Sequence, residues 1–167
     1  AGGNNSNQQS LALTSNALQL VNQSSGSTTE LAFGLPFDEL VSLLNNILQS
    51  GVASSGVNAE CGAGPIKFAT WNNGLSLAFM ENKTNEWLFA GWYVGAPSGS
   101  SPAMTTMSGI GIGSTRAELE DAYSVEVFES TLGQEFSTAS GLYGILSGTS
   151  KESTIEGLWS GVSCFFR

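Results

Sequence analysis

The acidic side chains are the residues with which this chain could carry out chemistry, because its 167 residues include no histidine. The sequence therefore lacks the usual general base, the commonest metal ligand and the base of Ser–His and Cys–His nucleophiles. Hydrolysis by a carboxylate pair would need Glu126, Glu129 or Glu135 to face another acid across a cleft. We expect that the protein is not an enzyme, with a carboxylate-dependent hydrolase of the cell envelope as the alternative.

Two groups of acidic residues stand where helices are expected to begin: Asp38 with Glu39, and Glu118 with Glu120 and Asp121. Carboxylates are favourable in the first turn of a helix, near the positive end of its dipole. Glu118 and Asp121 would share a helix face and could hold a divalent cation weakly, but a solvated helix start explains both groups. The sequence therefore predicts no metal site.

A glycine-rich stretch, GIGIGST at 109–115, precedes the second of these helices. A glycine-rich turn at a helix N-terminus can bind anions. The lysine of a phosphate-binding loop is missing, however, and no acidic residue about 20 positions further on suits a dinucleotide. We interpret the stretch as the glycine-bearing edge of a strand, and we predict no cofactor.

The composition argues against several classes of partner. The net charge is −9 and the five Lys and Arg residues are scattered, whereas nucleic-acid binding needs them clustered. The same charge disfavours docking on anionic lipid, and no apolar stretch approaches the roughly 18 residues of a membrane span. The abundance of Ser, Thr, Asn and Gly favours an extracytoplasmic protein, whether periplasmic, secreted or lipid-anchored at the cell surface. The polar start AGGNNSNQQS is typical of residues that follow a removed export signal or an upstream lipid anchor.

The two cysteines, Cys61 and Cys164, are far apart in the sequence. Their spacing excludes a CxxC redox centre and a cysteine zinc site. They could form a disulfide, which would imply an oxidising compartment, or they could be two buried free thiols. We prefer the disulfide.

A strand-to-helix junction organises the chain, and it occurs twice. The stretch 110–124 combines a short alternating strand, a cap at Ser114 or Thr115, and a helix. An earlier copy at 31–48 matches it at a spacing of 79. Downstream, three pairs match at a spacing of 67: Gly74 and Gly141, Leu75 and Leu142, and Trp92 and Trp159. The predicted units are a flexible tether at 1–9, a first repeat with an N-terminal hairpin at 10–100, and a second repeat with a C-terminal strand at 101–167.

Each repeat is expected to contain a strand, a helix and an antiparallel meander of three strands. The first meander is predicted at 66–71, 75–80 and 87–94, after a loop at 49–64. In the second repeat a strand at 105–112 leads into the helix, and strands follow at 136–139, 142–146 and 155–159. The predicted fold class is α+β, with two tandem repeats and the helices on one face of the sheet.

This order of elements resembles the tandem fold of the β-lactamase-inhibitor-protein family. The phrase IGIGSTRAEL is similar to the helix entry of that family and of small lipoproteins of outer-membrane assembly, with matches at Gly113, Ser114, Thr115, Arg116 and Leu119. The first copy matches only at Gly34 and Leu40. The stretch from CGAGP to SCFFR also resembles a kind of uncharacterised bacterial exported protein.

The sequence departs from that family in two respects. The inhibitors carry a disulfide inside each repeat, whereas two cysteines allow one bridge here, which we expect to lie between repeats. The inhibitors also present an acidic residue on a hairpin tip, and the tips at 72–74 and 140–141 have none. We therefore do not expect inhibition of a β-lactamase.

Four aromatic residues on the predicted strands are candidates for binding a partner: Trp87, Phe89, Trp92 and Trp159. Alternation along a strand places Trp87 and Phe89 on one face and Trp92 on the other. They could form a recognition patch on the open face of the sheet, or pack under the helices. We expect a non-enzymatic exported binding or structural module that recognises a protein partner through the open sheet face.

Overall fold

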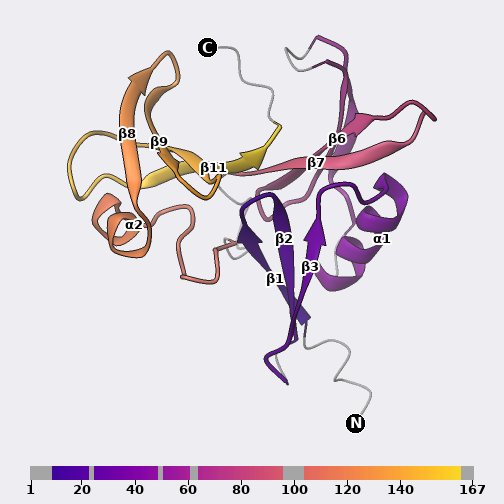
Figure 1. Cartoon of the computed structure of the whole chain (residues 1–167), viewed down its shortest axis with the longest axis horizontal. Helices are drawn as coiled ribbons and strands as arrows, with labels where there is room; N and C mark the ends of the chain where they lie inside the picture. Colours follow the sequence, from indigo (N-terminus) through magenta and orange to yellow (C-terminus); the bar gives the residue numbers. More distant parts are fainter. Residues whose placement is uncertain (1–8, 23–24, 49–50, 61–63, 96–103, 163–167) are drawn as a thin grey trace.

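The computed structural model describes residues 9–22, 25–48, 51–60, 64–95 and 104–162. Of these residues, 51% lie in strands and 14% in helices. The prediction of an α+β fold is therefore wrong: the described chain is mostly β, with two antiparallel sheets (Figure 1). The tether predicted at 1–9 lies outside the described residues except for Gln9, and Cys61, Cys164 and their predicted disulfide also lie outside them.

The smaller sheet is formed by β1 (Gln9–Thr14), β2 (Ala17–Asn22) and β3 (Thr28–Ala32), paired in that order. The predicted N-terminal hairpin is present as β1 and β2. Asn16 turns the chain between these strands with a φ of 61°, a left-handed conformation that Asn tolerates better than most residues. We call these three strands the small sheet.

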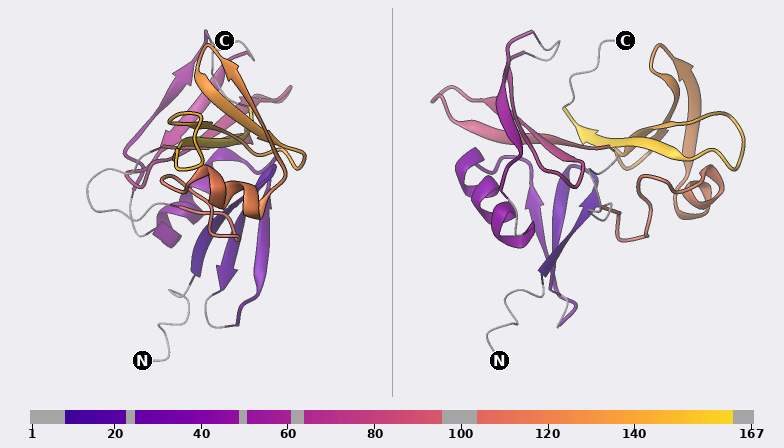
Figure 2. Two further views of the ribbon diagram at one scale, coloured as in Figure 1. Left: turned by 90° about the vertical axis from the view of Figure 1, so that its left-hand side faces the viewer. Right: turned by 180° about the vertical axis from the view of Figure 1, so that it is seen from behind.

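The large sheet has eight strands in the order β4-β5-β6-β7-β11-β10-β9-β8, so two four-stranded meanders meet at β7 and β11. The first half contains β4 (Ser54–Asn58), β5 (Ile66–Thr70), β6 (Leu75–Glu81) and β7 (Trp87–Val94). The second half contains β8 (Val125–Ser130), β9 (Gly133–Thr138), β10 (Tyr143–Leu146) and β11 (Ile155–Gly161). The outer ends of both halves rise on the side away from the small sheet (Figure 2).

The predicted strands differ from the observed ones in three places. β4 lies within the predicted loop at 49–64, and its sequence SSGVN shows no apolar alternation because it is a mostly exposed edge strand. β8, the other edge, lies in a stretch for which the sequence predicts no element. The strand predicted at 105–112 is wrong, since the chain turns back there and Thr106 N–H donates to Ile110 O at 2.8 Å.

The helices α1 (Phe37–Leu48) and α2 (Arg116–Ala122) do not form the predicted layer on one face of the sheet. α1 contacts β1 of the small sheet as well as β7, and it buries Leu40 and Leu44. α2 buries Leu119 alone. The core instead joins residues of both sheets and both helices, and Leu13, Leu18, Leu77, Trp92 and Phe136 are among its buried members.

The central ladder relates the two halves of the large sheet. Its pairs include Val94 with Leu158, Tyr93 with Trp159, and Trp92 with Ser160. A shift of 66 residues carries Trp92 to Leu158 and Tyr93 to Trp159, and it reproduces the same pairs with the strands exchanged. The predicted equivalence of Trp92 and Trp159 at a spacing of 67 is therefore wrong by one residue.

The hairpin turns of the two halves do correspond at a spacing of 67. Trp71 N–H donates to Leu75 O at 2.9 Å, and Thr138 N–H donates to Leu142 O at the same distance. Gly74 and Gly141 both have positive φ, at 91° and 105°, in these turns.

A β-bulge at Ala90 changes the alternation along β7. Gly91 pairs with Ala78 and Phe89 pairs with Phe79, so Ala90 is the extra residue. One extra residue moves the side chains that follow it to the other face. The prediction that Phe89 and Trp92 point to opposite faces is wrong for this reason.

Candidate functional site

The large sheet has an inner face, turned toward the small sheet, and an outer face on the opposite side (Figure 2). Trp92 Nε1 donates to Thr14 O at 3.0 Å, and Ser160 Oγ accepts from Asn16 N–H at 2.9 Å. Trp92 and Ser160 therefore lie on the inner face. Because neighbouring residues along a strand point to opposite faces, Tyr93 and Trp159 lie on the outer face.

The four predicted aromatic residues do not form an exposed patch. Phe89, Trp92 and Trp159 are 2%, 1% and 2% exposed, and Phe89 and Trp92 belong to the core. The expectation that these three present a recognition surface is wrong. Trp87 is half-buried at the start of β7 and lies apart from the outer face, beside a cavity.

A row of paired residues crosses the outer face of the large sheet. Cross-strand pairing connects its members in the order Ser76, Tyr93, Trp159, Tyr143, Ser137 and Glu126. At its centre the rings of Tyr93 and Trp159 are stacked, with centroids 6.2 Å apart. Burial and, to a smaller extent, the charge of Glu156 raise the pKa of Tyr93 above its ordinary value.

The exposed aromatic residues of the outer face lie in the second half. Phe128 on β8 is 42% exposed and Tyr143 on β10 is 37% exposed. Phe128 is two positions from Glu126 on the same strand, so both point outward. Glu135 on β9 lies between Phe128 on β8 and Ile145 on β10, because it pairs with both residues.

The sequence reasoning did not single out Phe128 or Tyr143 as functional residues. The alternation of VEVFES at 125–130, with valines on the inner side, is the signal that could have found Phe128. Tyr143 had no such signal, because its four-residue strand is too short to show a pattern.

The three carboxylates named for the hydrolase alternative lie on the neighbouring strands β8 and β9. Glu126 and Glu129 are exposed on the edge strand β8. Glu135 is 1% exposed on β9, and Ser130 Oγ donates a hydrogen bond to it. Glu135 therefore acts within the sheet, linking the end of β8 to β9.

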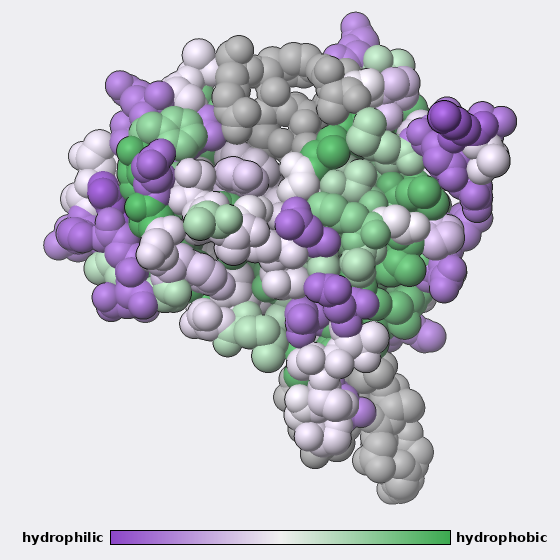
Figure 3. All heavy atoms as spheres, in the orientation of Figure 1, coloured by the Kyte–Doolittle hydropathy of each residue, from purple (hydrophilic) through white to green (hydrophobic). Residues whose placement is uncertain are grey.

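The cavity beside Trp87 is a second candidate site, with a volume of about 220 Å³. Its walls include two aromatic rings, Phe37 and Trp87, and three charged side chains, Asp38, Lys67 and Glu86. Lys67 Nζ lies 4.0 Å from the centroid of the Phe37 ring, a cation–π contact. In Figure 3 the hydrophilic turn between β6 and β7 projects beside a hydrophobic surface over β6, β7 and α1.

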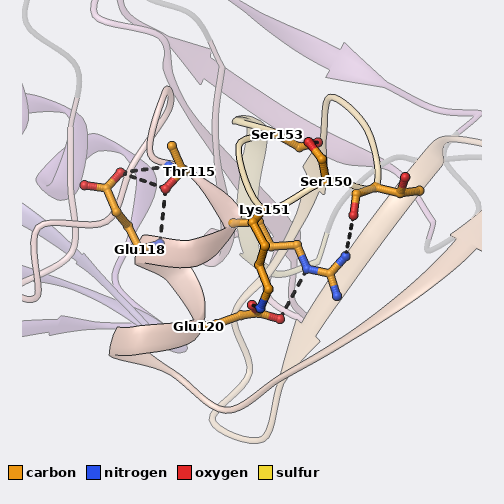
Figure 4. A network of polar contacts seen from close by, with 8 residues as sticks. Thr115, Glu118, Glu120, Ser150, Lys151 and Ser153 are labelled. Atoms are coloured by element: carbon orange, nitrogen blue, oxygen red, sulfur yellow. Dashed lines mark hydrogen bonds and ion pairs between the residues drawn. The ribbon is translucent and has the colours of Figure 1, made fainter.

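A reciprocal capping box fixes the start of α2 (Figure 4). Thr115 Oγ1 accepts from Glu118 N–H at 3.2 Å, and Glu118 Oε1 accepts from Thr115 N–H at 2.9 Å. The sequence predicts a cap at Ser114 or Thr115, and Thr115 provides it. Ser114 Oγ instead accepts from Gly111 N–H at 3.0 Å, and Gly113 N–H donates to Ile155 O at 2.9 Å. These N–H groups of the glycine-rich stretch are thus already bonded within the fold.

Charged side chains attach the loop between β10 and β11 to α2. Arg116 Nη1 donates to Thr149 O at 2.9 Å, and Arg116 Nε donates to Glu120 at 3.2 Å. Lys151 forms an ion pair with the same carboxylate (Figure 4). Hydrogen bonding from Lys151, with a smaller contribution from Arg116, lowers the pKa of Glu120. The loop that follows the Tyr143 strand is held in this way.

Within the described residues, no three Asp, Glu, Cys or His side chains gather as a metal site requires. Neither described helix has the length and apolar character needed to cross a membrane. No family model, curated protein or solved structure matches the chain.

Proposed function

We propose that the protein is a non-enzymatic binding module that recognises a protein partner through the outer face of the second half of the large sheet. The observation that carries the proposal is the exposure of Phe128 and Tyr143 on that face. Large aromatic side chains supply much of the binding energy at protein interfaces. Here they project from paired strands, which keep their positions fixed before a partner arrives.

The charges of this surface favour a partner with a basic binding segment. Glu126 is exposed beside Phe128, and Glu156 lies close enough to Tyr93 to affect its pKa. The described strands β7 to β11 contain no Lys or Arg. Complementary charge raises the rate of association and disfavours partners of like charge.

We also propose an extracytoplasmic location, either free or anchored at the cell surface. The support is the composition, in which Ser, Thr, Asn and Gly dominate the polar residues. A partner of the envelope or exterior would follow from that location.

The test compares three forms of the purified protein in cross-linking from an envelope extract, with captured proteins quantified by mass spectrometry. The double variant Phe128→Ala/Tyr143→Ala removes the exposed rings. Met107→Ala is the matched control, because Met107 is a 61% exposed large hydrophobic residue in the 104–112 loop.

The expected result is a protein captured equally by the wild type and Met107→Ala and at least about tenfold less by the double variant, as hot-spot losses imply. Its capture should also weaken with added salt, because a charged contact is screened. Equal capture by all three forms would show that the outer face is not the binding surface.

A further inference from the structure

The cavity beside Trp87 is lined by one positive side chain, Lys67, and two negative ones, Asp38 and Glu86. Lys67 forms no ion pair with Asp38, with Glu86 or with any other described residue. Lys67 Nζ rests on the Phe37 ring instead. A pocket of this kind offers separate contacts to a cationic and an anionic group.

Glu86, one of the two acidic residues of the cavity, is held in place by its own turn. Asn82 Oδ1 accepts from Thr84 N–H and from Glu86 N–H, both at 2.9 Å. Glu86 Oε1 accepts from Thr84 Oγ1 at 3.1 Å. These bonds set the position of the Glu86 backbone and carboxylate at the cavity before any ligand binds, which reduces the entropy lost on binding.

The volume of the cavity sets the scale of the group that it can hold. Liquid water occupies about 30 Å³ per molecule, so about 220 Å³ corresponds to roughly seven waters. A ligand with a similar number of non-hydrogen atoms is the size of a free amino acid. The indole of Trp87 offers an apolar wall for its side chain.

We propose that this cavity binds a small zwitterion of the α-amino-acid class. The ammonium group of the ligand lies toward Asp38 and Glu86, its carboxylate toward Lys67, and its apolar part against Trp87. Such contacts are charge-assisted hydrogen bonds, which are stronger than neutral ones. This site is separate from the outer face, so it does not depend on the proposed protein recognition.

The first experiment is titration calorimetry of the full chain with a panel of free L-amino acids. The best binder is then compared with its decarboxylated and deaminated analogues; for L-leucine these are 3-methylbutylamine and 4-methylpentanoate. At least one amino acid should bind with a Kd of about 1 mM or lower, and each analogue should bind at least about tenfold more weakly. Absence of binding across the panel, or equal binding of an analogue, overturns the proposal.

The second experiment uses charge variants that leave the core untouched. Lys67→Met and Glu86→Gln should each weaken binding about tenfold or more. Lys83→Met is the matched control, because Lys83 lies in the same turn and does not line the cavity; its affinity should equal that of the wild type. Unchanged affinity in Lys67→Met, or an equal loss in Lys83→Met, contradicts the assigned site.

Discussion

The two halves of the large sheet fill the same inner-face position in opposite ways. In the first half Ala69 on β5 pairs with Leu77 on β6; in the second, Phe136 on β9 pairs with Gly144 on β10. Ala69, Leu77 and Phe136 are completely buried. A Cβ placed on Gly144 would overlap the Phe136 ring. The large side chain of the pair is Leu77 on β6 in the first half and Phe136 on β9 in the second, and in both halves the pair fills the space.

This difference shows that the shared backbone layout constrains the volume of a buried pair more than its residue types. The volume of the corresponding pair on the outer face is not constrained in this way. Thr70 and Ser76 pair in the first half, with their hydroxyl oxygens 2.8 Å apart, where the second half has Ser137 and Tyr143. A small polar residue satisfies the fold at this position, so the exposed ring of Tyr143 is not required by the architecture.

The largest expected effect comes from exchanging the buried pair. Phe136→Ala alone should lower the free energy of unfolding by about 3–5 kcal/mol through the cavity it leaves. Gly144→Leu alone should also destabilise, because its Cβ would overlap both the Phe136 ring and the backbone oxygen of Gly157. The double variant Phe136→Ala/Gly144→Leu removes the overlap with the ring, though not the one with Gly157 O, and should lose less than the sum of the single losses. Urea unfolding of all four proteins measures this coupling, and strict additivity would refute the compensation.

The next effect concerns the contact between the sheets. Trp92→Phe removes the hydrogen bond to Thr14 O and should lower the free energy of unfolding by about 1–3 kcal/mol. Trp71→Phe is a matched control, because Trp71 Nε1 donates to Asn45 Oδ1 on α1 at 2.9 Å and not to the small sheet. Hydrogen exchange should speed up in β1 and β2 for Trp92→Phe only. The same exchange pattern in both variants would argue against Trp92 as the link between sheets.

A smaller effect is expected at the start of α2. Thr115→Ala removes one side of the capping box and should lower the free energy of unfolding by about 0.5–2 kcal/mol. The corresponding position before α1 is Pro36, which has no such side chain, and α1 relies on its buried face. Thr115→Ser keeps the hydroxyl and should retain most of the stability. An equal loss in both variants would mean that the threonine methyl group, and not the cap, matters.

The smallest effect is the acid sensitivity of the α2 network. The lowered pKa of Glu120 means that its ion pairs stabilise the fold fully above the ordinary pKa of a glutamate, and that this contribution is lost as the pH falls through the folded pKa. Glu120→Gln should flatten the fall in thermal midpoint over that range at low salt. Lys151→Met should act similarly, and the double variant should add little. If Glu120→Gln kept the full fall in thermal midpoint at low pH, groups other than Glu120 would be responsible for that fall.

Local signals in the sequence found the elements that form from short-range interactions. Leu40 and Leu44 at helical spacing predicted α1, and the Asn-Gly pair at 73–74 predicted the hairpin of β5 and β6. The capping sequence predicted the start of α2. Each of these features depends on residues that lie a few positions apart in the sequence.

The features that the sequence did not show depend on pairing between distant segments. β4 and β8 are edge strands whose exposed residues need no hydrophobic pattern. The bulge at Ala90 is defined by the pairing of β6 with β7. It places Phe89 and Trp92 on the same face, whereas the sequence pattern predicts opposite faces. Phe128 and Tyr143 became candidates because the sheet order places their strands two apart on one face.

The hydrogen bond between Asn16 and Ser160 spans 144 positions, and this has a consequence for the order of events during synthesis. The first hairpin is synthesised long before β7 and β11, the strands to which it hydrogen-bonds. Until β11 is made, β7 remains an unpaired edge that could join the wrong strand. Closing so long a loop is slow compared with local folding. We therefore expect the native arrangement to be completed only after translation of the final strand.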